Sequence, residues 1–301
     1  MNIVLTGGTG FIGTHLTNML EQRGHNLIIL TRNPQKYKDR INPKRSYRSI
    51  EDDMLSSVAE SDAIINLAGE NMIFRRWTKK TKEKLMDSRV ETTARLVRAI
   101  EKAKNKPSVM ISASAAGYYG SRSDDMLNEN EPPGDDFAAE ICVRWEEESQ
   151  KAEKYGVRVV NPRFGVILER DGGALKTMLP FFNLFMGASV GSGKQYFPWI
   201  HMRDLGDSII FALYEEKLKG VYNASSPNPV TIDEFTKTLG KVMNRPVLFR
   251  IPGFALKLIF GEGSMTILAS LRLIPEVLQN HGFQYEYPRL EEALRSILKT
   301  R

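Results

Sequence analysis

The sequence predicts an α/β protein: a Rossmann-type, doubly wound parallel sheet followed by a smaller, mostly helical lobe. Over the first half, apolar runs of four to six residues alternate with helical patterns, as strands buried on both faces of a parallel sheet do. A glycine-rich motif separates the first strand from the first helix. After about Gly165 this alternation loosens. Right-handed crossovers between such strands produce a doubly wound sheet.

The expected elements follow in order along the chain. Strands are predicted at residues 2–6, 26–31, 44–48, 63–67, 108–112 and 157–160. Helices are predicted at residues 11–23, 55–61, 79–104 and 137–155. Pro162 stops the last strand, since proline cannot donate to a sheet. We therefore expect a Rossmann domain over residues 1–165 and a substrate lobe over residues 166–301, with a strand near residues 220–224 returning to the main sheet.

The strongest motif is Thr6-Gly7-Gly8-Thr9-Gly10-Phe11-Ile12-Gly13, between the first strand and the first helix. In a dinucleotide site the first glycine makes the tight turn, the second lets the pyrophosphate approach, and the third lets helix and strand pack closely. Free N–H groups at the helix start then hold the phosphates. A purely structural turn is the alternative, and the strand and helix on either side favour nucleotide binding.

The end of the second strand selects the cofactor. A carboxylate there would bind the ribose 2′-hydroxyl of NAD, whereas arginine suits the 2′-phosphate of NADP. This chain has Thr31 and Arg32 at that place, and the guanidinium matches phosphate oxygens. The alternative is that Arg32 is only a surface residue. We expect NADP(H).

Composition excludes several classes of protein. The longest apolar runs have the length of strands, so no membrane partner is expected. The first strand starts at residue 2, which leaves no room for a signal peptide. One cysteine and four histidines without ligand spacing indicate neither a disulfide nor a metal site, and a cytoplasmic location fits. The net charge is +6, and residues 75–84 are strongly basic. We expect these basic residues to form a solvated surface, and contact with an anionic cofactor or substrate is the alternative. No nucleic acid partner is expected.

Several motifs together resemble one superfamily. The glycine motif, Asn66-Leu67-Ala68-Gly69, and Ser112-Ala113-Ser114 before Tyr118-Tyr119-Gly120 resemble the extended short-chain dehydrogenases/reductases, the NAD-dependent epimerase/dehydratase group. Arg76-Trp77, residues 88–93, Trp145-Glu146 and the run 187–204 are similar to its "epimerase family protein" subgroup. That subgroup is an atypical one. Some of its members are described as cell-division-inhibitor-like, and it carries a short C-terminal domain of unknown function. The resemblance covers nearly the whole chain.

The resemblance implies a small-molecule substrate and a set of cofactor contacts. These contacts would come from Gly7, Gly10, Phe11, Ile12, Gly13, Thr31, Arg32, Leu67, Ala68, Gly69, Arg89 and the stretch from Arg163 to Ile167. Simple core burial is the alternative for Leu67, and a solvated helix face is the alternative for Arg89. The resemblance also implies that residues 199–204, with His201 and Asp204, shape the back of the substrate site. Members of the superfamily are often homodimers.

The catalytic pattern of the superfamily is missing. Its members protonate or deprotonate the substrate with a Tyr-x-x-x-Lys pair and a nearby serine, because a lysine ammonium favours the phenolate. None of the ten tyrosines has a lysine four residues later, and the aligned positions hold Cys142 and Glu146. Ordinary dehydrogenase chemistry is therefore in doubt.

Other residues are candidates for the missing groups. Ser114 matches the serine of the family, or else bonds to its own backbone. Tyr118 and Tyr119 lie near the expected substrate, or else only pack over the cleft. Arg122 would favour a phenolate at Tyr118 if that segment were helical. The lone Cys142 is expected to be inert, and a desolvated Glu146 could act as an acid or base.

Two functions remain open at this point. One is an NADP(H)-dependent oxidoreductase or epimerase-like enzyme that acts on an unknown small polar substrate, with Ser114, Tyr118 and Tyr119 as its catalytic candidates. The other is a catalytically impaired NADPH sensor or regulatory module, which the missing Tyr-x-x-x-Lys pair favours. Fold alone does not decide between them.

Overall fold

The computed structural model describes residues 1–39 and 42–299. Its centre is a parallel sheet in the order β13-β8-β5-β4-β1-β2-β3, with the two-residue β6 (Ser114–Ala115) added beside β8. The sheet contains β1 (Asn2–Thr6), β2 (Asn26–Thr31), β3 (Arg45–Ser49), β4 (Ala63–Asn66), β5 (Val109–Ser112), β8 (Arg158–Phe164) and β13 (Gly220–Ala224). The predicted Rossmann-type, doubly wound sheet is confirmed.

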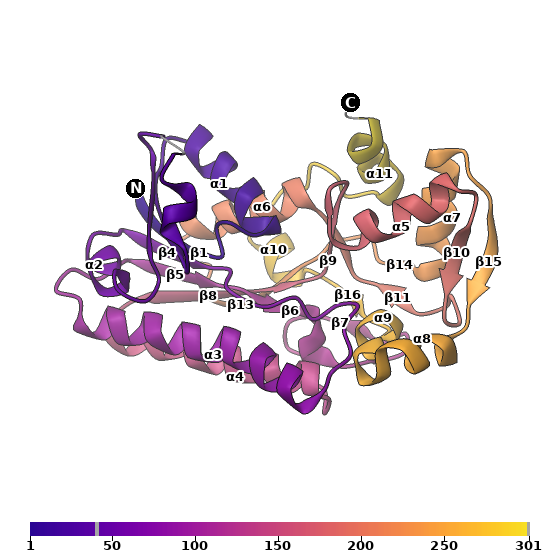
Figure 1. Cartoon of the computed structure of the whole chain (residues 1–301), viewed down its shortest axis with the longest axis horizontal. Coiled ribbons are helices and arrows are strands. Elements are labelled where there is room, and N and C mark those ends of the chain that lie inside the picture. Colours follow the sequence, from indigo (N-terminus) through magenta and orange to yellow (C-terminus); the bar gives the residue numbers. More distant parts are fainter. Residues whose placement is uncertain (40–41, 300–301) are drawn as a thin grey trace.

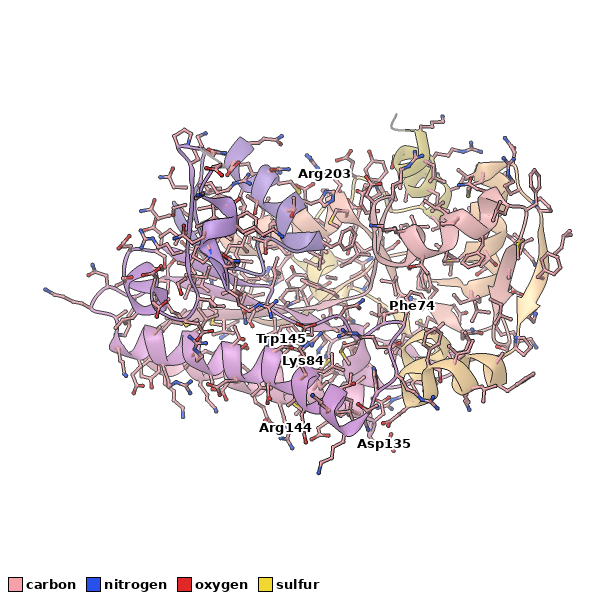
Figure 2. All side chains as sticks on the ribbon, viewed as in Figure 1. Phe74, Lys84, Asp135, Arg144, Trp145 and Arg203 are labelled. Atoms are coloured by element: carbon pink, nitrogen blue, oxygen red, sulfur yellow. The ribbon has the colours of Figure 1, made fainter. Side chains whose placement is uncertain are left out.

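Helices cover both faces of the sheet (Figure 1). One face packs against α1 (Phe11–Gln22) and α6 (Met202–Tyr214). The other packs against α2 (Met54–Ala59), α3 (Lys79–Lys102) and α4 (Phe137–Gln150). Because side chains alternate along a strand, Ile3 and Leu5 enter the first core and Val4 enters the second, all fully buried. Figure 2 shows the same division in α4, where Arg144 lies outside and Trp145 faces the sheet.

The strand that we expected to end before Pro162 continues to Phe164, so that expectation was wrong. The neighbour β5 pairs with β8 only as far as Val160, and β6 begins to pair at Arg163. Pro162 lies in the gap between these two partners. Its missing N–H therefore costs no hydrogen bond on that side of the strand.

The C-terminal lobe has its own core. It is mostly helical, as predicted, and is built from α5 (Gly173–Asn183), α7 (Ile232–Met243) and α11 (Leu290–Lys299) against β9 (Val166–Glu169) and β12 (Trp199–His201). Its smaller elements are η4 (Gly261–Ser264), β10 (Gly187–Val190), β11 (Tyr196–Phe197), β14 (Val230–Thr231), β15 (Val247–Ile251), β16 (Arg272–Leu273), α8 (Gly253–Phe260), α9 (Met265–Leu268) and α10 (Glu276–Asn280). The smaller elements of the N-terminal half are η1 (Pro34–Tyr37), η2 (Ala116–Tyr119), β7 (Met126–Leu127) and η3 (Lys151–Tyr155). The later α6 and β13 join the central sheet, so that sheet takes segments from both sides of residue 165.

Two buried polar residues at the start of α6 hold the C-terminal segment. The His201 Nδ1 accepts a hydrogen bond from the Arg203 N–H, and the ring stacks on Tyr287 with centroids 4.1 Å apart. The Asp204 carboxylate accepts the N–H groups of Glu286 at 2.7 Å and Tyr287 at 3.1 Å. The structure thus gives this pair a role in packing, where the resemblance implied the back of the substrate site.

Burial makes these two residues respond to pH in opposite directions. It lowers the pKa of His201 from 6.5 to about 4, so stability from this group is lost as pH falls from 6.5 to 4. It raises the pKa of Asp204 from 3.8 to about 6, so stability from that group is lost as pH rises from 3.8 to 6. Each pKa shift changes the free energy of unfolding by about 3 kcal/mol. Between pH 4 and pH 6 the two contributions change in opposite directions.

When one of the two groups is replaced, the pH dependence of stability that comes from the other should become measurable. The H201N variant keeps an acceptor for the helix cap, and its free energy of unfolding relative to wild type should rise by up to about 3 kcal/mol as pH falls from 6.5 to 4. The D204N variant should show the opposite slope. Urea unfolding of the three proteins across this range is the measurement, and parallel curves would contradict the assignment.

Candidate cofactor-binding site

The glycine loop crosses the ends of two neighbouring strands with no room for side chains. Gly7 has a φ of 68°, and a Cβ there would lie 2.6 Å from the main-chain oxygen of Leu67, just after β4. A Cβ at Gly13 would lie 2.2 Å from the Gly7 oxygen. At Gly10 a Cβ would lie 3.2 Å from the same oxygen, a tight contact, and no other atom would lie within 4 Å of it. The loop therefore fits a bound pyrophosphate that approaches Gly10.

The start of α1 leaves its N–H groups available for an anion. Gly10 is the N-cap and supplies no side-chain bond, and no acidic residue lies in the first turn. The Thr14 N–H bonds back to the Gly10 oxygen at 3.0 Å, so the N–H groups of Phe11, Ile12 and Gly13 precede the first complete helical bond. Such a helix start attracts phosphate.

The loop lies where the strand order reverses. The neighbours of β1 are β2 and β4, so the chain winds outward in both directions from this point, where open α/β sheets bind ligands. Asn66 ties the strand ends together: its Oδ1 accepts from Thr6 at 2.6 Å, and its Nδ2 donates to Thr93 and Ser112. The next two residues, Leu67 and Ala68, lie against Gly7 of the glycine loop. Sequence analysis used Asn66 as part of a motif but missed this role.

Phe11 connects the glycine loop to the lobe. A Cβ at Gly172 would lie 2.1 Å from its ring, and one at Gly173 would lie 3.3 Å from it. Gly172 is the N-cap of α5 and Gly173 its first residue, just after β9. The strand β9 also holds Ile167, which is half-buried and pairs with Ile200. Ile12 is likewise half-buried against the central core. Phe11 from the glycine motif and the segment that begins with Ile167 in the lobe, both of which the family resemblance assigns to the cofactor, therefore approach one another at the start of α1.

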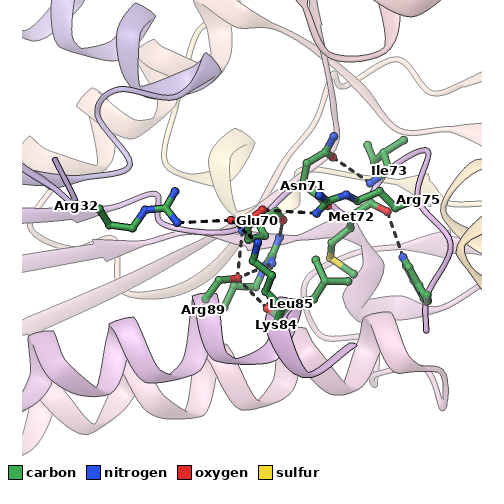
Figure 3. Close-up of polar contacts among 11 residues, drawn as sticks. Arg32, Glu70, Asn71, Met72, Ile73, Arg75, Lys84, Leu85 and Arg89 are labelled. Carbon is green, nitrogen blue, oxygen red and sulfur yellow. Dashed lines mark hydrogen bonds and ion pairs between the residues drawn. The ribbon is translucent and has the colours of Figure 1, made fainter. Parts of the chain in front are cut away.

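Arg89 is buried in α3, and the structure excludes the solvated face that was the alternative for it. Its guanidinium donates to the main-chain oxygens of Glu70 at 2.8 Å and Leu85 at 3.1 Å (Figure 3). It also lies over the Trp145 ring, 5.3 Å from the centroid. A Cβ at Gly69 would lie 3.1 Å from the guanidinium carbon. Arg89 therefore fixes the main chain that follows β4.

Arg32 belongs to a cluster of charges around Glu70 (Figure 3). The Glu70 carboxylate lies 3.8 Å from Arg32, 3.5 Å from Arg75 and 3.6 Å from Lys84. The Arg32 side chain is 83% exposed, and that of Glu70 only 23%. Three cations around one carboxylate leave an excess of positive charge beside the end of β2, where Thr31 is half-buried. Sequence analysis missed Glu70, although it directly follows the Asn66–Gly69 motif.

Two shallow depressions lie beyond Glu70, at the start of α3, and neither includes the glycine loop. The candidate cofactor site is therefore marked by the close packing around the glycines and not by either depression. The first depression, about 540 Å³, combines apolar and charged side chains from Trp77, Lys79, Lys82, Glu83, Met86, Asp87 and Phe137. The second, about 330 Å³, is basic and is lined by Arg75, Arg76, Thr78, Lys80, Thr81 and Lys84.

A buried ion pair forms at Glu146, the position that we expect to correspond to the usual catalytic lysine. Arg163 binds Glu146 with two bonds of 2.9 Å, and both residues are about 95% buried or more. The Ser114 hydroxyl donates to the same carboxylate at 2.6 Å. The Glu147 side chain, next to Glu146, is exposed. The serine expected to hold substrate thus has its proton committed to Glu146, and the Arg163 guanidinium faces the interior.

Tyr119 extends this network. Its hydroxyl accepts from Arg163 at 2.9 Å and donates to Asn223 Oδ1 at 2.7 Å. Burial raises the pKa of Tyr119 to about 12, so the phenol stays neutral. The Asn223 N–H in turn donates to the buried carboxylate of Glu129, whose pKa burial also raises. Sequence analysis missed Asn223 and Glu129, because no local pattern marks them.

Tyr118 is the remaining candidate. Its ring lies flat against the Arg163 guanidinium, 3.4 Å from centroid to carbon, and it is half-buried. Its hydroxyl makes no hydrogen bond to residues 1–39 or 42–299. Arg122 bonds to main-chain oxygens, including that of Tyr119, and so does not provide the charge we considered for it. Burial raises the pKa of Cys142 to about 12, and this protonated thiol donates to the Ala115 oxygen at 3.6 Å.

Comparisons with known proteins agree with this geometry. Residues 3–225 match the model of the NAD dependent epimerase/dehydratase family. The chain belongs to this family. Residues 251–297 match a domain of unknown function, DUF1731, which confirms the predicted subgroup. The structure describes no helix long and apolar enough to cross a membrane.

Relatives extend over the whole chain. The Arabidopsis thaliana "Epimerase family protein SDR39U1 homolog, chloroplastic" is 39% identical and covers 99% of this chain and 87% of its own. Bacillus subtilis "Epimerase family protein YfhF" is 37% identical and covers 100% of this chain and 99% of its own. A crystal structure of human epimerase family protein SDR39U1 with NADPH has a TM-score of 0.88 at 33% identity and covers all of both chains. The Thermotoga maritima UDP-glucose 4-epimerase, 18% identical with a TM-score of 0.78, covers 99% of this chain and 98% of its own and shares the fold.

Two glycine substitutions should separate folding from cofactor binding. In G10A the new methyl group makes one tight contact, 3.2 Å from the Gly7 oxygen, so the free energy of unfolding should fall by only about 1 kcal/mol while affinity for NADPH falls at least about tenfold. In G13A the methyl group collides with the Gly7 oxygen, so the cofactor-free protein should itself melt earlier. Thermal melts and calorimetric titration measure both. Unchanged affinity in G10A would count against the site.

Proposed function

We propose that this protein binds NADP(H) at the glycine loop, with its 2′-phosphate beside Arg32. The glycines leave room for a pyrophosphate, and the uncapped start of α1 suits its charge. The excess of cations around Glu70 suits a 2′-phosphate better than a hydroxyl. The human relative crystallised with NADPH supports the same choice. Arg89 supports the site by binding the main-chain oxygen of Glu70. We assign the remaining cofactor contacts to Phe11, Ile12, Thr31, Leu67, Ala68, Gly69 and Ile167.

We propose that the protein is an NADP(H)-dependent oxidoreductase or epimerase-like enzyme with Tyr118 as its general acid. NADPH supplies the hydride. The observation that carries this proposal is that the Tyr118 hydroxyl has no hydrogen-bond partner among residues 1–39 and 42–299, while the hydroxyls of Ser114 and Tyr119 bond within the buried network. A neutral phenol can donate its proton to the alkoxide that forms when a carbonyl is reduced. Stacking on Arg163 holds the ring in place.

The substrate we propose is small and polar, with an anionic group. Arg75, Arg76 and Lys80 line the basic depression next to Glu70, and this surface would attract such a group. The lone cysteine, reduced in the structure, suits the cytoplasm as the compartment.

The second candidate is an NADPH sensor. The observation in its favour is the ion pair between Glu146 and Arg163, which occupies the catalytic position and engages Ser114. Side chains whose hydrogen bonds are already made within the protein have few donors and acceptors left to bind a substrate. In this reading the cofactor changes the surface that a partner contacts, and no turnover takes place.

Kinetics of matched tyrosine variants should distinguish the two candidates. We expect wild type to oxidise NADPH with at least one member of a panel of small carbonyl compounds that includes carboxylates and phosphates. In Y118F the turnover number should fall about 100-fold or more with unchanged affinity for NADPH, because only the proton donor is lost. Y119F, which removes a buried hydroxyl, is the control. Tight NADPH binding without turnover on any compound would favour the sensor.

Substitutions at Arg32 and Glu70 should affect the two cofactors differently. R32A should weaken NADPH binding about tenfold or more and leave NADH unchanged, because only NADPH carries the 2′-phosphate. E70Q removes a carboxylate that competes for Arg32, so NADPH should bind about two- to fivefold more tightly. Calorimetric titration of each variant with both cofactors is the measurement. Equal losses for NADPH and NADH in R32A would remove the assignment of Arg32.

A further inference from the structure

The outer end of the lobe exposes an unusual amount of apolar surface. Ten large side chains there are between 39% and 76% exposed. At about 200 Å² for each large side chain, they present roughly 1,000 Å², against roughly 300–600 Å² for the largest patch of a typical monomer. We call this surface the apolar strip. Its members are Phe181, Leu184, Phe185, Met186, Leu248, Phe249, Ile251, Phe254, Leu258 and Ile259.

The strip draws its members from three adjoining segments. The chain after α5 supplies its first part, and there the Arg245 guanidinium lies 4.3 Å from the centre of the Phe185 ring. Strand β10 follows and pairs with β15, so that Gly187 lies opposite Val247. After Ile251 only Pro252 separates β15 from α8. Figure 1 shows β15 and α8 at the outer end of the lobe, away from the central sheet.

Helix α8 turns its apolar side chains to the outside. Phe254 and Leu258, one turn apart, are each about three-quarters exposed, and Ile259 is 60% exposed. Only Leu256 of this helix is buried. A helix that is apolar all round is normally enclosed by protein or lipid, so water alone is an unfavourable neighbour for this one.

The segments that carry the strip are basic. Residues 181–186 and 245–261, which form it, contain Arg245, Arg250 and Lys257 and no aspartate or glutamate. The neighbouring carboxylates Asp233 and Glu262 pair with Arg250 and Lys82. Lys257 lies on the exposed face of α8, as Phe254 and Leu258 do. Apolar side chains beside Arg245 and Lys257, which form no ion pair with a carboxylate of the described residues, complement a surface that is both apolar and anionic.

We propose that the apolar strip binds the surface of a membrane rich in anionic phospholipids. Phe254, Leu258 and Ile259 enter the boundary of the acyl chains, while Lys257 and Arg245 face the head groups. This contact needs no spanning helix. It therefore revises our expectation from sequence, in which the absence of a long apolar run led us to expect no membrane partner.

A second copy of the chain fits the strip less well. In a twofold dimer the same surface meets itself, so Lys257 and Arg245 would approach their own copies. The edge strand β15 is also poorly suited to pair with another strand. Its register with β10 shifts at Gly187, and Pro246 and Pro252 flank it. Irregular register and flanking prolines are features that protect sheet edges from pairing.

Sedimentation with lipid vesicles tests the proposal on the full chain. We expect the protein to sediment with vesicles of phosphatidylcholine containing phosphatidylglycerol, to do so less as salt is raised, and to stay in solution with phosphatidylcholine alone. The double variant F254S/L258S should bind the anionic vesicles at least about tenfold more weakly, and K257E should also bind more weakly. The control L55S removes a side chain that is 45% exposed on α2, outside the strip, and should bind as wild type does.

Several outcomes would overturn the proposal. One is no sedimentation of wild type with the anionic vesicles. Another is equal binding by F254S/L258S, K257E and L55S. Analytical ultracentrifugation without lipid tests the second copy directly: a wild-type dimer that F254S/L258S converts to monomer, together with no vesicle binding, would assign the strip to self-association.

Discussion

The buried ion pair between Glu146 and Arg163 organises the candidate catalytic region. It joins α4 to β8, and through Ser114 and Tyr119 it reaches β6, η2 and β13. Removing one partner of such a pair leaves an uncompensated buried charge, which typically costs about 3–5 kcal/mol. A lysine in place of Glu146 would set two cations side by side. The chain therefore cannot regain the usual Tyr-x-x-x-Lys arrangement by single substitutions, and Tyr118 remains as the free hydroxyl of the three candidates.

The cofactor region depends on a different constraint, which is close packing of main chain. Gly7 and Gly13 have no room for a Cβ, so the loop, the end of β4 and the start of α1 form one rigid unit. Arg89 supports the next segment through the Glu70 oxygen, and the Glu70 side chain then meets Arg32. The carboxylate around which Arg32, Arg75 and Lys84 gather is thus attached to the same main chain that packs against the glycine loop. The place of Glu70 therefore follows from backbone packing, whereas the Arg32 side chain is largely exposed.

Local patterns in the sequence were sufficient for the central sheet and the glycine loop. Alternation of strands and helices, and glycines at fixed spacing, depend on neighbouring residues, and a sequence displays these directly. The pairing of Glu146 with Arg163 joins residues 17 apart through the packing of α4 on β8, and no local pattern encodes it. Burial of Arg89 and continuation of β8 through Pro162 depend in the same way on the neighbours of each element. The helical character of the lobe could be predicted from helix propensity. The exposed face of α8 could not, because it depends on which other elements pack against that helix.

Helix α5 links the cofactor crevice to the apolar strip. It begins at Gly173, against the Phe11 ring of the glycine loop, and ends at Asn183, where Leu184 to Met186 enter the strip. Eleven helical residues span about 16 Å, and Pro180 lies inside the helix. Leu175 and Phe182, both buried, fix the helix to the core of the lobe. A single element thus contacts the glycine loop at one of its ends and the apolar strip at the other.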